Sequence, residues 1–546
     1  MQCAMSFLNT ILKRGIFLSI SLLLAGLMAC QNHSGTASEK LAGKSHYLFD
    51  EADFTRELKT LLPASLDTAT DTSLHRALAD VYISRAYRPV WVSEQGALAR
   101  TRQLIQDLDS LNLDGLDPED YQISRIKNQL SAVATAKKKE ALHLAIGLDT
   151  ACTRAYLKAS RHLLFGKIGP RLADSLWFHE NDTVWSAPAL LSRPDQPYVS
   201  LDHFRSRFPG YASMRQAYQQ FSLLKTDTAF LSLRRSSLAD SMLPAYINKL
   251  LPKPLSADST AAFLRAYQQW RGLKITGNAD SATRACLNSD PDALLPLLAI
   301  NMERLRWLPQ HLGQRAILIN IPAMELFFFE KGQLTQHMKT VVGRKSRQTP
   351  SLNALMKTII FNPSWGVPPT ILKKDVKSGL GRSGSSYLAR KGLRAYTRQG
   401  KEVPRDQINA ANASNYVFRQ PPGPRNALGI VKFDMPNKWD IYLHDTPHRW
   451  DFQRRDRALS SGCIRLEHPR SLAVYLLQDL EGKNYNLQKI DTIAATRKTR
   501  YQKLEHPFMV HLVYLTAFPD SNMQGIRFLP DIYEKDERLQ SAMSAR

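Results

Sequence analysis

The sequence predicts a multidomain α+β protein, because its hydrophobic pattern changes period along the chain. From about Tyr47 to Asp240 apolar residues recur three and four positions apart, as on the buried face of helices. From Arg315 the pattern alternates every second residue, which is typical of strands. The chain has 546 residues, too many for a single core, and its 43% hydrophobic content is ordinary for a folded protein. We therefore expect a mainly helical region followed by a β-rich domain.

The N-terminal residues have the layout of an export signal. A basic pair at 13–14 precedes an apolar run at 15–28, which is too short to predict a membrane span. The run ends in "LMAC", which resembles the bacterial lipobox, in which Cys30 becomes the lipid-bearing first residue. We expect a lipoprotein signal at 1–29, a flexible tether at 30–46 and a lipid-anchored protein. A cleaved signal in which Cys30 is incidental is the alternative.

Residues 47–240 are predicted to form a helical scaffold, since no cluster of reactive side chains stands out in them. A smaller three-helix module is predicted at 241–290, with a loop "RGLKITGNAD" before a helix that opens at Asp280 or Ser281. A linker helix is predicted at 291–314. The spacing of the module's apolar residues predicts a small core of Phe263, Tyr267, Trp270, Leu273, Ile275, Thr283 and Leu287.

A β-rich, sandwich-like domain is predicted at 315–490. Two apolar-rich strands flank a turn at 330–333, and "MKTIIFNPSW", "LGIVKFDM" and "WDIYLHD" have the pattern of further strands. A stretch rich in serine, glycine and basic residues interrupts the domain at about 377–419. A connection of this length is either functional, as an active-site lid, or an inert insertion. Residues 491–546 remain as a C-terminal extension.

Charge and cysteine usage narrow the function. The net charge of +24 suggests either attraction to an anionic cell envelope or simply a solvated surface, and in an exported chain it does not indicate nucleic acid. Three cysteines remain in the mature chain, an odd number, so at least one free thiol is expected. Cys152 and Cys286 lie in helical patterns, where a buried small residue is expected. No zinc-binding pattern occurs, and we predict no metal and no cofactor.

Cys463 stands in a different context, at the end of the turn "SSGC" that precedes a helix. Gly462 can adopt a positive φ, which would expose the thiol and free backbone N–H groups for an oxyanion. His444 ends the strand "WDIYLHD" on the side opposite its apolar residues and could accept the thiol proton. Arg465 adds positive potential. On spacing alone, a catalytic and a structural cysteine both remain open.

The segment "HDTP" from His444, followed by "SSGCIR" up to Arg465, resembles the catalytic signature of the L,D-transpeptidases of the YkuD family. The segments "VVGRKSRQTP", "FNPSWGVPPTI" and "PPGPRNALGIVKF" fit a branch of large periplasmic enzymes with a helical scaffold. The module at 241–290 resembles the peptidoglycan-binding type 1 domain of that branch. The alternative is a helical hairpin that only packs between its neighbours.

The resemblance implies roles for individual residues. Cys463 would be the nucleophile, His444 the general base and later acid, and the backbone carbonyl of Asp445 the group that orients the histidine. Arg465 would either polarise the thiolate or hold the loop through backbone carbonyls. The turn and the oxyanion donors would come from Ser460, Ser461 and Gly462. The candidate substrate-binding residues are Tyr442, Trp365, Asn426 and Gly429, whereas His448 and His468 are expected to have capping or surface roles.

The resemblance also implies a reaction on peptidoglycan stem peptides in the periplasm. Cys463 would attack the carbonyl of the third stem residue and release the terminal D-alanine. An amine of a second stem would then attack the thioester and form a 3→3 cross-link. Sensitivity to carbapenems, which acylate the cysteine, is expected. An L,D-carboxypeptidase that uses water as acceptor and a non-catalytic, lipid-anchored peptidoglycan-binding scaffold are the alternatives.

Overall fold

The computed structural model describes residues 47–66, 72–181, 183–235, 239–520 and 525–545. The predicted signal, the lipidation of Cys30 and the tether lie outside the described residues. Within these ranges, no helix has the length and apolarity that crossing a membrane requires. From Leu48 onward the chain forms one compact unit, and the predicted α+β organisation is confirmed.

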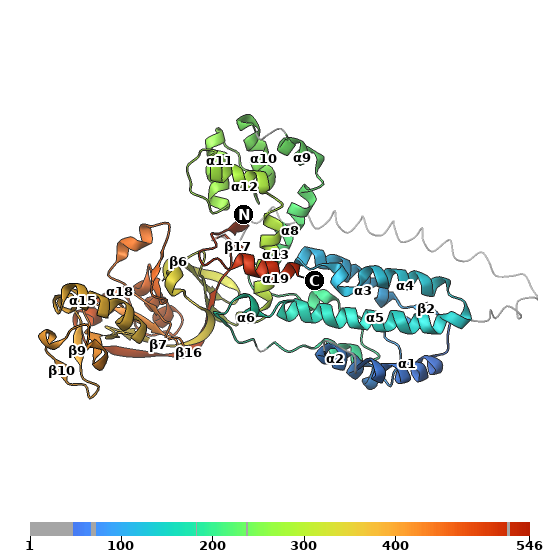
Figure 1. Ribbon diagram of the computed structural model, residues 1–546, viewed down its shortest axis with the longest axis horizontal. Coiled ribbons are helices and arrows are strands. Elements are labelled where there is room, and N and C mark those ends of the chain that lie inside the picture. Colours follow the sequence, from blue (N-terminus) through green and yellow to red (C-terminus); the bar gives the residue numbers. More distant parts are fainter. Residues whose placement is uncertain (1–46, 67–71, 182, 236–238, 521–524, 546) are drawn as a thin grey trace, which may run out of the picture. The chain divides into compact units, whose positions relative to one another are not determined.

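The N-terminal helical region packs around one long helix, α5 (Lys138–Phe165), which runs alongside α3 and α4 (Figure 1). Asp149 of α5 is fully buried and accepts hydrogen bonds from the Tyr82 hydroxyl (2.6 Å) and from the backbone N–H of Trp91 (2.6 Å). Cys152, on the same helix, is buried as expected, whereas Cys286 is partly exposed; both are free thiols. This region therefore has its own hydrophobic core, and the buried Asp149 carboxylate ties α5 to neighbouring segments by hydrogen bonds. Its other elements are α1 (Glu51–Leu66), α2 (Thr72–Ser84), β1 (Val92–Ser93), β2 (Gly96–Ala97), α3 (Ala99–Asp109), η1 (Ser110–Asp114), η2 (Pro118–Tyr121), α4 (Ile123–Thr135), α6 (Pro170–Ala173), β3 (Trp177–Phe178), α7 (Ala187–Ser192), η3 (Leu201–Phe204), α8 (Tyr211–Leu224), α9 (Thr228–Arg235) and η4 (Asp240–Met242).

The small module consists of α10 (Leu243–Leu250), α11 (Thr260–Trp270) and α12 (Ser281–Ser289). Asp280 caps α12, because its carboxylate accepts a hydrogen bond from the Thr283 N–H (2.9 Å). Trp270 donates from Nε1 to the Ile526 carbonyl (2.7 Å), so the module packs against the C-terminal part of the chain. The predicted core residue Ile275 is instead 53% exposed, because it lies in the loop and not on a helix face.

The predicted linker helix, α13 (Leu294–Arg306), is a buried central element. Its apolar residues pack on several sides, and Arg306 is fully buried beside Glu303, with Nη1 to Oε2 at 2.8 Å. Asn301 donates to the Thr516 hydroxyl (2.9 Å), which follows strand β16 of the β-rich domain. The helix therefore joins the helical region to the β-rich domain by packing and by polar contacts.

The β-rich domain is built on one sheet with the strand order β12-β13-β15-β6-β5-β4-β16-β7-β3. Because β12 pairs with both β13 and β7, the sheet closes on itself, and the two walls of the predicted sandwich belong to one continuous sheet. Strand β16, which the sequence analysis left in a C-terminal extension, pairs in parallel with β4 and antiparallel with β7. Its elements outside the insertion are β4 (Arg315–Asn320), β5 (Glu325–Glu330), β6 (Gln333–Gly343), η5 (Lys345–Arg347), β7 (Ser351–Phe361), β12 (Val431–Asp434), β13 (Leu443–His444), η9 (Arg449–Gln453), β14 (Ala458–Ser460), β15 (Ile464–Leu466), α17 (Pro469–Val474), η10 (Tyr475–Asp479), α18 (Leu487–Ala495), β16 (Arg500–Val513), β17 (Ala517–Pro519), β18 (Ile526–Phe528) and α19 (Asp536–Ser544).

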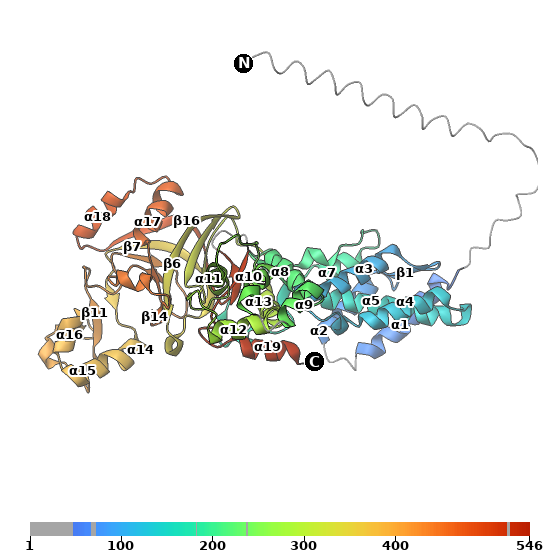
Figure 2. The ribbon, with the colours of Figure 1, turned by 90° about the horizontal axis from the view of Figure 1, so that it is seen from above.

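The predicted insertion is an ordered subdomain with its own sheet, in the order β10-β9-β11-β8. It begins at Trp365, earlier than the predicted 377, because β8 pairs with β11 at its other end. Helix α15 contacts α16, and Figure 2 shows the two helices together in this subdomain. Its core contains Val376, Leu380, Leu388, Leu393, Ala395, Ile408, Ala413 and Phe418. Its elements are β8 (Trp365–Gly366), α14 (Pro369–Ile371), η6 (Leu372–Val376), α15 (Lys377–Ser383), α16 (Ser386–Lys391), β9 (Arg394–Tyr396), β10 (Glu402–Val403), η7 (Arg405–Gln407), η8 (Ala413–Asn415) and β11 (Val417–Gln420).

A chain that ends at Lys498 should lose the cooperative unfolding of the β-rich domain. It lacks β16, whose buried side chains include Val510 and Leu512, each worth roughly 1.5–3 kcal/mol of burial. The edges of β4 and β7 would also lose their hydrogen-bond partner. Thermal unfolding followed by near-UV circular dichroism tests this. A chain that ends at Asp536 is the control and should keep the transition; an unchanged transition in the shorter chain would contradict the account.

Candidate functional site

The turn that carries Cys463 is fixed by hydrogen bonds. The Ser460 hydroxyl donates to the Cys463 carbonyl (2.6 Å) and accepts from the Gly462 N–H (3.0 Å). Gly462 has φ of 122°, as its place in the turn predicts. Thr349 donates from its hydroxyl to the Gly462 carbonyl (2.8 Å). Because the Gly462 N–H is already bonded within the turn, the contribution of Gly462 to an oxyanion site is its conformation and not this N–H.

His444 lies on β13, the parallel neighbour of β15, and β15 directly follows this turn. Their register sets Leu443 opposite Ile464 and His444 opposite Arg465, at a strand spacing of about 4.8 Å. His444 is 5% exposed, and its Nδ1 lies 2.5 Å from the Asp445 carbonyl oxygen. A carbonyl can only accept, so Nδ1 carries the proton and Nε2 keeps its lone pair. The predicted orienting contact with Asp445 is therefore present.

The environment keeps both reactive groups neutral. Burial, reinforced by the charge of Arg465 and then of Lys432, lowers the pKa of His444 to about 3. Burial raises the pKa of the Cys463 thiol, although hydrogen bonds with Tyr442 and the charge of Lys432 oppose this. The thiol donates to the Asp440 carbonyl, with Sγ to O at 3.6 Å. The resting site thus holds a thiol and a neutral imidazole rather than an ion pair.

Tyr442 and Trp365, two predicted substrate-binding residues, meet beside the thiol. Burial raises the pKa of Tyr442 above its ordinary value, so its hydroxyl stays protonated; Cys463 shifts this pKa in the same direction and Trp365 opposes the shift, as expected of residues that lie close to the hydroxyl. Its ring centroid lies 5.7 Å from that of His444. Trp365 opens the insertion, which therefore reaches the site.

Lys432 was missed in the sequence analysis. Its Nζ lies 4.3 Å from the centre of the Tyr442 ring, and its strand position pairs with His444. Val431 and Phe433 are buried whereas Lys432 is only half-buried, so the alternation in "IVKFD" already places Lys432 on the other face of β12. That alternation was the signal that could have identified it.

Arg465 forms an ion pair with Asp451, with Nη1 to Oδ2 at 3.1 Å. Asp451 is 5% exposed and belongs to η9, so this pair joins β15 to the segment that follows His444. The observed partner is a carboxylate and not the backbone carbonyls of the alternative role. The guanidinium also lowers the pKa of His444.

Asn426 and Gly429, two of the predicted substrate-binding residues, make structural contacts, and their role in substrate binding stays a prediction. Asn426 is 2% exposed; its Nδ2 donates to the Pro363 carbonyl (3.0 Å) and its Oδ1 accepts from the Leu428 N–H (2.8 Å). Gly429 has φ of +62°, and a Cβ there would lie 2.3 Å from the Asp445 carboxylate. The space that glycine leaves is therefore filled by Asp445.

The remaining predicted residues lie at the edge of the site. Ser461 is exposed, and its hydroxyl accepts a hydrogen bond from Arg347 Nη1 (2.8 Å). His448 is exposed just before η9, and His468, with 61% of its side chain exposed, precedes α17 near Glu467. Both histidines are placed as the sequence analysis expected, in a turn and at a helix start.

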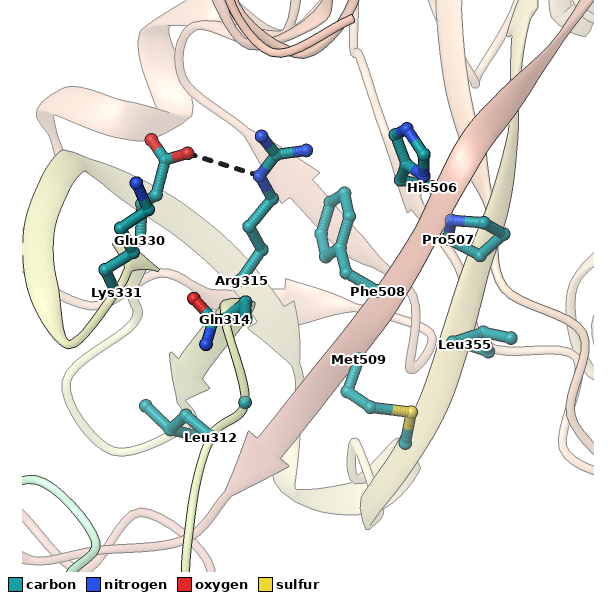
Figure 3. A pocket seen from close by; sticks show the side chains of 11 residues that line it. Leu312, Gln314, Arg315, Glu330, Lys331, Leu355, His506, Pro507, Phe508 and Met509 are labelled. Atoms are coloured by element: carbon teal, nitrogen blue, oxygen red, sulfur yellow. Dashed lines mark hydrogen bonds and ion pairs between the residues drawn. The ribbon is translucent and has the colours of Figure 1, made fainter.

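A cavity of about 460 Å³ lies elsewhere, between the loop before β4 and strand β16 (Figure 3). The Arg315–Glu330 ion pair, with Nε to Oε1 at 3.2 Å, lies in its wall beside Phe508. None of the predicted site residues lines it. The candidate site is therefore defined by the turn and its strands rather than by this cavity.

Comparison with known proteins finds a family match over the part of the chain that contains His444 and Cys463. Residues 314–482 match the family model "YkuD: L,D-transpeptidase catalytic domain", and residues 76–217 match the "Scaffold domain" model. A curated Haemophilus influenzae protein named "Putative L,D-transpeptidase" is 33% identical over 248 residues, which are 45% of this chain and 49% of that protein. The chain thus spans about half the length of this relative. Similar solved structures include an L,D-transpeptidase from Mycobacterium smegmatis and the LD transpeptidase LdtMt1 in complex with imipenem. Both are 13% identical to this chain, with a TM-score of 0.18. The match to the first covers 36% of this chain and 58% of that structure's chain, and the match to the second covers 37% and 59%.

Gly429→Ala should destabilise the protein by about 1–3 kcal/mol, because alanine at positive φ is strained and its Cβ would displace the Asp445 carboxylate. Gly400→Ala is the matched control: its φ is +90°, but no atom lies within 4 Å of the added Cβ. Urea unfolding measures both free energies of unfolding. Equal losses in the two variants would show that backbone strain alone, and not the contact with Asp445, is responsible.

The rate of alkylation of Cys463 by iodoacetamide should rise only at alkaline pH, with its midpoint above the ordinary thiol pKa of about 8.5. Because the pKa of His444 is about 3, the profile should show no step near pH 6.5. Peptide mapping by mass spectrometry separates Cys463 from Cys286. A step between pH 6 and 7 that disappears in His444→Gln would contradict the neutral pair.

Proposed function

We propose that this chain, which carries an L,D-transpeptidase catalytic domain at residues 314–482, forms 3→3 cross-links between peptidoglycan stem peptides. The observation that carries the proposal is the juxtaposition of two groups. Cys463 leads into β15, and β13, its neighbour, carries a neutral His444 whose Nδ1 is held by the Asp445 carbonyl. Nε2 is the nitrogen left to accept a proton.

In the first half-reaction, Cys463 Sγ attacks the carbonyl carbon of the third stem residue while its proton moves to His444 Nε2. The tetrahedral intermediate then collapses, the C–N bond to the terminal D-alanine breaks, and the imidazolium protonates the departing amine. Burial and two nearby cations make that imidazolium a strong acid, with a pKa of about 3, so it gives up its proton readily. The product is a thioester on Cys463.

In the second half-reaction, the side-chain amine of another stem attacks the thioester carbonyl. His444 takes a proton from the amine, and the thiol leaves with a proton returned from the imidazolium. The insertion supports transfer over hydrolysis, because Trp365 brings it into contact with Tyr442 beside the thiol, where it can exclude water. If water reaches the thioester instead, the same residues give an L,D-carboxypeptidase.

The rest of the chain is proposed to hold the enzyme at its substrate. The signal-like N-terminus supports export and lipid anchoring through Cys30 in the periplasm. The module of α10, α11 and α12 is proposed to bind peptidoglycan, on the basis of its sequence pattern. A purely non-catalytic scaffold has less support, because a binding protein does not need an oriented histidine beside a thiol.

Incubation of the chain with a disaccharide-tetrapeptide should yield a cross-linked dimer with loss of D-alanine, detected by mass spectrometry. Cys463→Ala should abolish this product, and His444→Ala should slow it by about 10²–10⁴-fold, because the proton acceptor is lost. Cys286→Ala, which removes a partly exposed thiol elsewhere, is the matched control and should stay active.

The products separate the alternatives. A tripeptide without dimer would replace the transpeptidase with a carboxypeptidase. Unchanged substrate, with folded protein, would contradict both enzymatic functions.

A further inference from the structure

A basic side chain outside the predicted site joins the Cys463 turn to the insertion. Arg347 donates from Nη1 to the Ser461 hydroxyl (2.8 Å). Its guanidinium also forms two parallel bonds with Asp375, from Nη1 to Oδ2 (2.6 Å) and from Nη2 to Oδ1 (2.7 Å). Ser461 lies two residues before Cys463, whereas Asp375 lies in η6 at the start of the insertion. One planar group therefore contacts both parts.

The backbone around Arg347 is attached to the same turn. The Arg344 N–H donates to the Ser460 carbonyl (3.1 Å), and the Arg347 N–H donates to the Arg344 carbonyl (2.8 Å). A Cβ on Gly343 would lie 2.3 Å from the Arg347 carbonyl oxygen, so the chain is closely packed here. Arg347 thus moves with the turn, and Asp375 is its partner on the insertion.

The geometry and the charges of this contact favour a strong pair. The Arg347 side chain is 13% exposed and the Asp375 side chain 39% exposed, so solvent screens the pair only in part, and the two bonds are short and parallel. The hydrogen bond from Arg347 lowers the pKa of Asp375, and Arg344 and Lys374 act in the same direction. Asp375 is therefore ionised at neutral pH, where the contact is complete.

We propose that Arg347 is a positioning residue that sets the Ser461-Gly462-Cys463 turn against the insertion, so that acyl transfer requires the insertion to be docked through Asp375. This inference rests on the proposed function. Without the guanidinium, Ser461 loses a hydrogen bond and Asp375 loses its partner, but Cys463, His444 and the Ser460 bonds remain. Orientation for acyl transfer should suffer, while the chemical reactivity of the thiol should not.

The test uses the full-length chain and compares Arg347→Ala, Asp375→Ala and the double variant. Both single variants should lower kcat/KM for cross-linking by about 10- to 100-fold, since each removes a charge-assisted, two-bond contact. The kcat/KM of the double variant should be at most about twofold lower than that of the less active single variant, because both changes break the same contact. Arg347→Lys, which keeps the charge but not the fork, should recover only part of the activity.

Two further readouts separate positioning from general damage. The alkylation rate of Cys463 by iodoacetamide should change less than about twofold in every variant. Amide hydrogen exchange in Asp375→Ala should become faster both at 460–463 and at 372–376. Glu402→Ala is the matched control, because its pair with Arg394 (3.4 Å) lies wholly within the insertion; it should leave activity and exchange at 460–463 unchanged.

The inference is overturned if Asp375→Ala keeps wild-type kcat/KM, if the effects of the two single changes multiply, or if alkylation of Cys463 falls in parallel with activity. If the wild-type chain forms no product, the proposed function fails on its own. In that case hydrogen exchange still decides the contact: unchanged exchange at 460–463 in Asp375→Ala would refute it.

Discussion

The parallel pairing of β13 with β15 is the constraint on which the rest of the site depends. It places His444 opposite Arg465 and brings the cysteine that precedes β15 next to the histidine strand. Both strands are short, so their positions are set by longer neighbours. β12 pairs with β13, and β6 pairs with β15. Because the sheet closes through β12 and β7, a change in the register of either site strand would disturb the whole ring.

Burial determines the chemical state of this arrangement. It lowers the pKa of His444 to about 3 and raises that of Cys463, so the pair rests without charge. In the proposed reaction, a charged intermediate forms only when the proton crosses from sulfur to nitrogen. Lys432 and Arg465 favour the thiolate and disfavour the imidazolium, which suits the proposed return of the proton from the histidine to a leaving amine.

Local sequence patterns predicted much of the site, because short-range chemistry fixes it. The positive φ of Gly462 was expected from its place in the turn, and the contact from His444 Nδ1 to the Asp445 carbonyl was implied by the family resemblance of the adjacent residues. Long-range contacts carry no such signal. Arg347 lies 114 residues from Ser461, and the pairing of β16 with β4 joins segments nearly 200 residues apart. The sequence alone did not distinguish the role of Gly429, because a glycine that accommodates a side chain and one that accommodates a substrate have the same sequence pattern.

The central claim, acyl transfer through a thioester, is tested most directly by trapping the intermediate. The chain is mixed with a disaccharide-tetrapeptide, quenched in acid within seconds, and examined by intact-mass measurement and peptide mapping. The account predicts an adduct equal to the substrate minus D-alanine, attached to the peptide that contains Cys463 and released by hydroxylamine. Product formation without such an adduct, or an adduct that persists in Cys463→Ala, would contradict it.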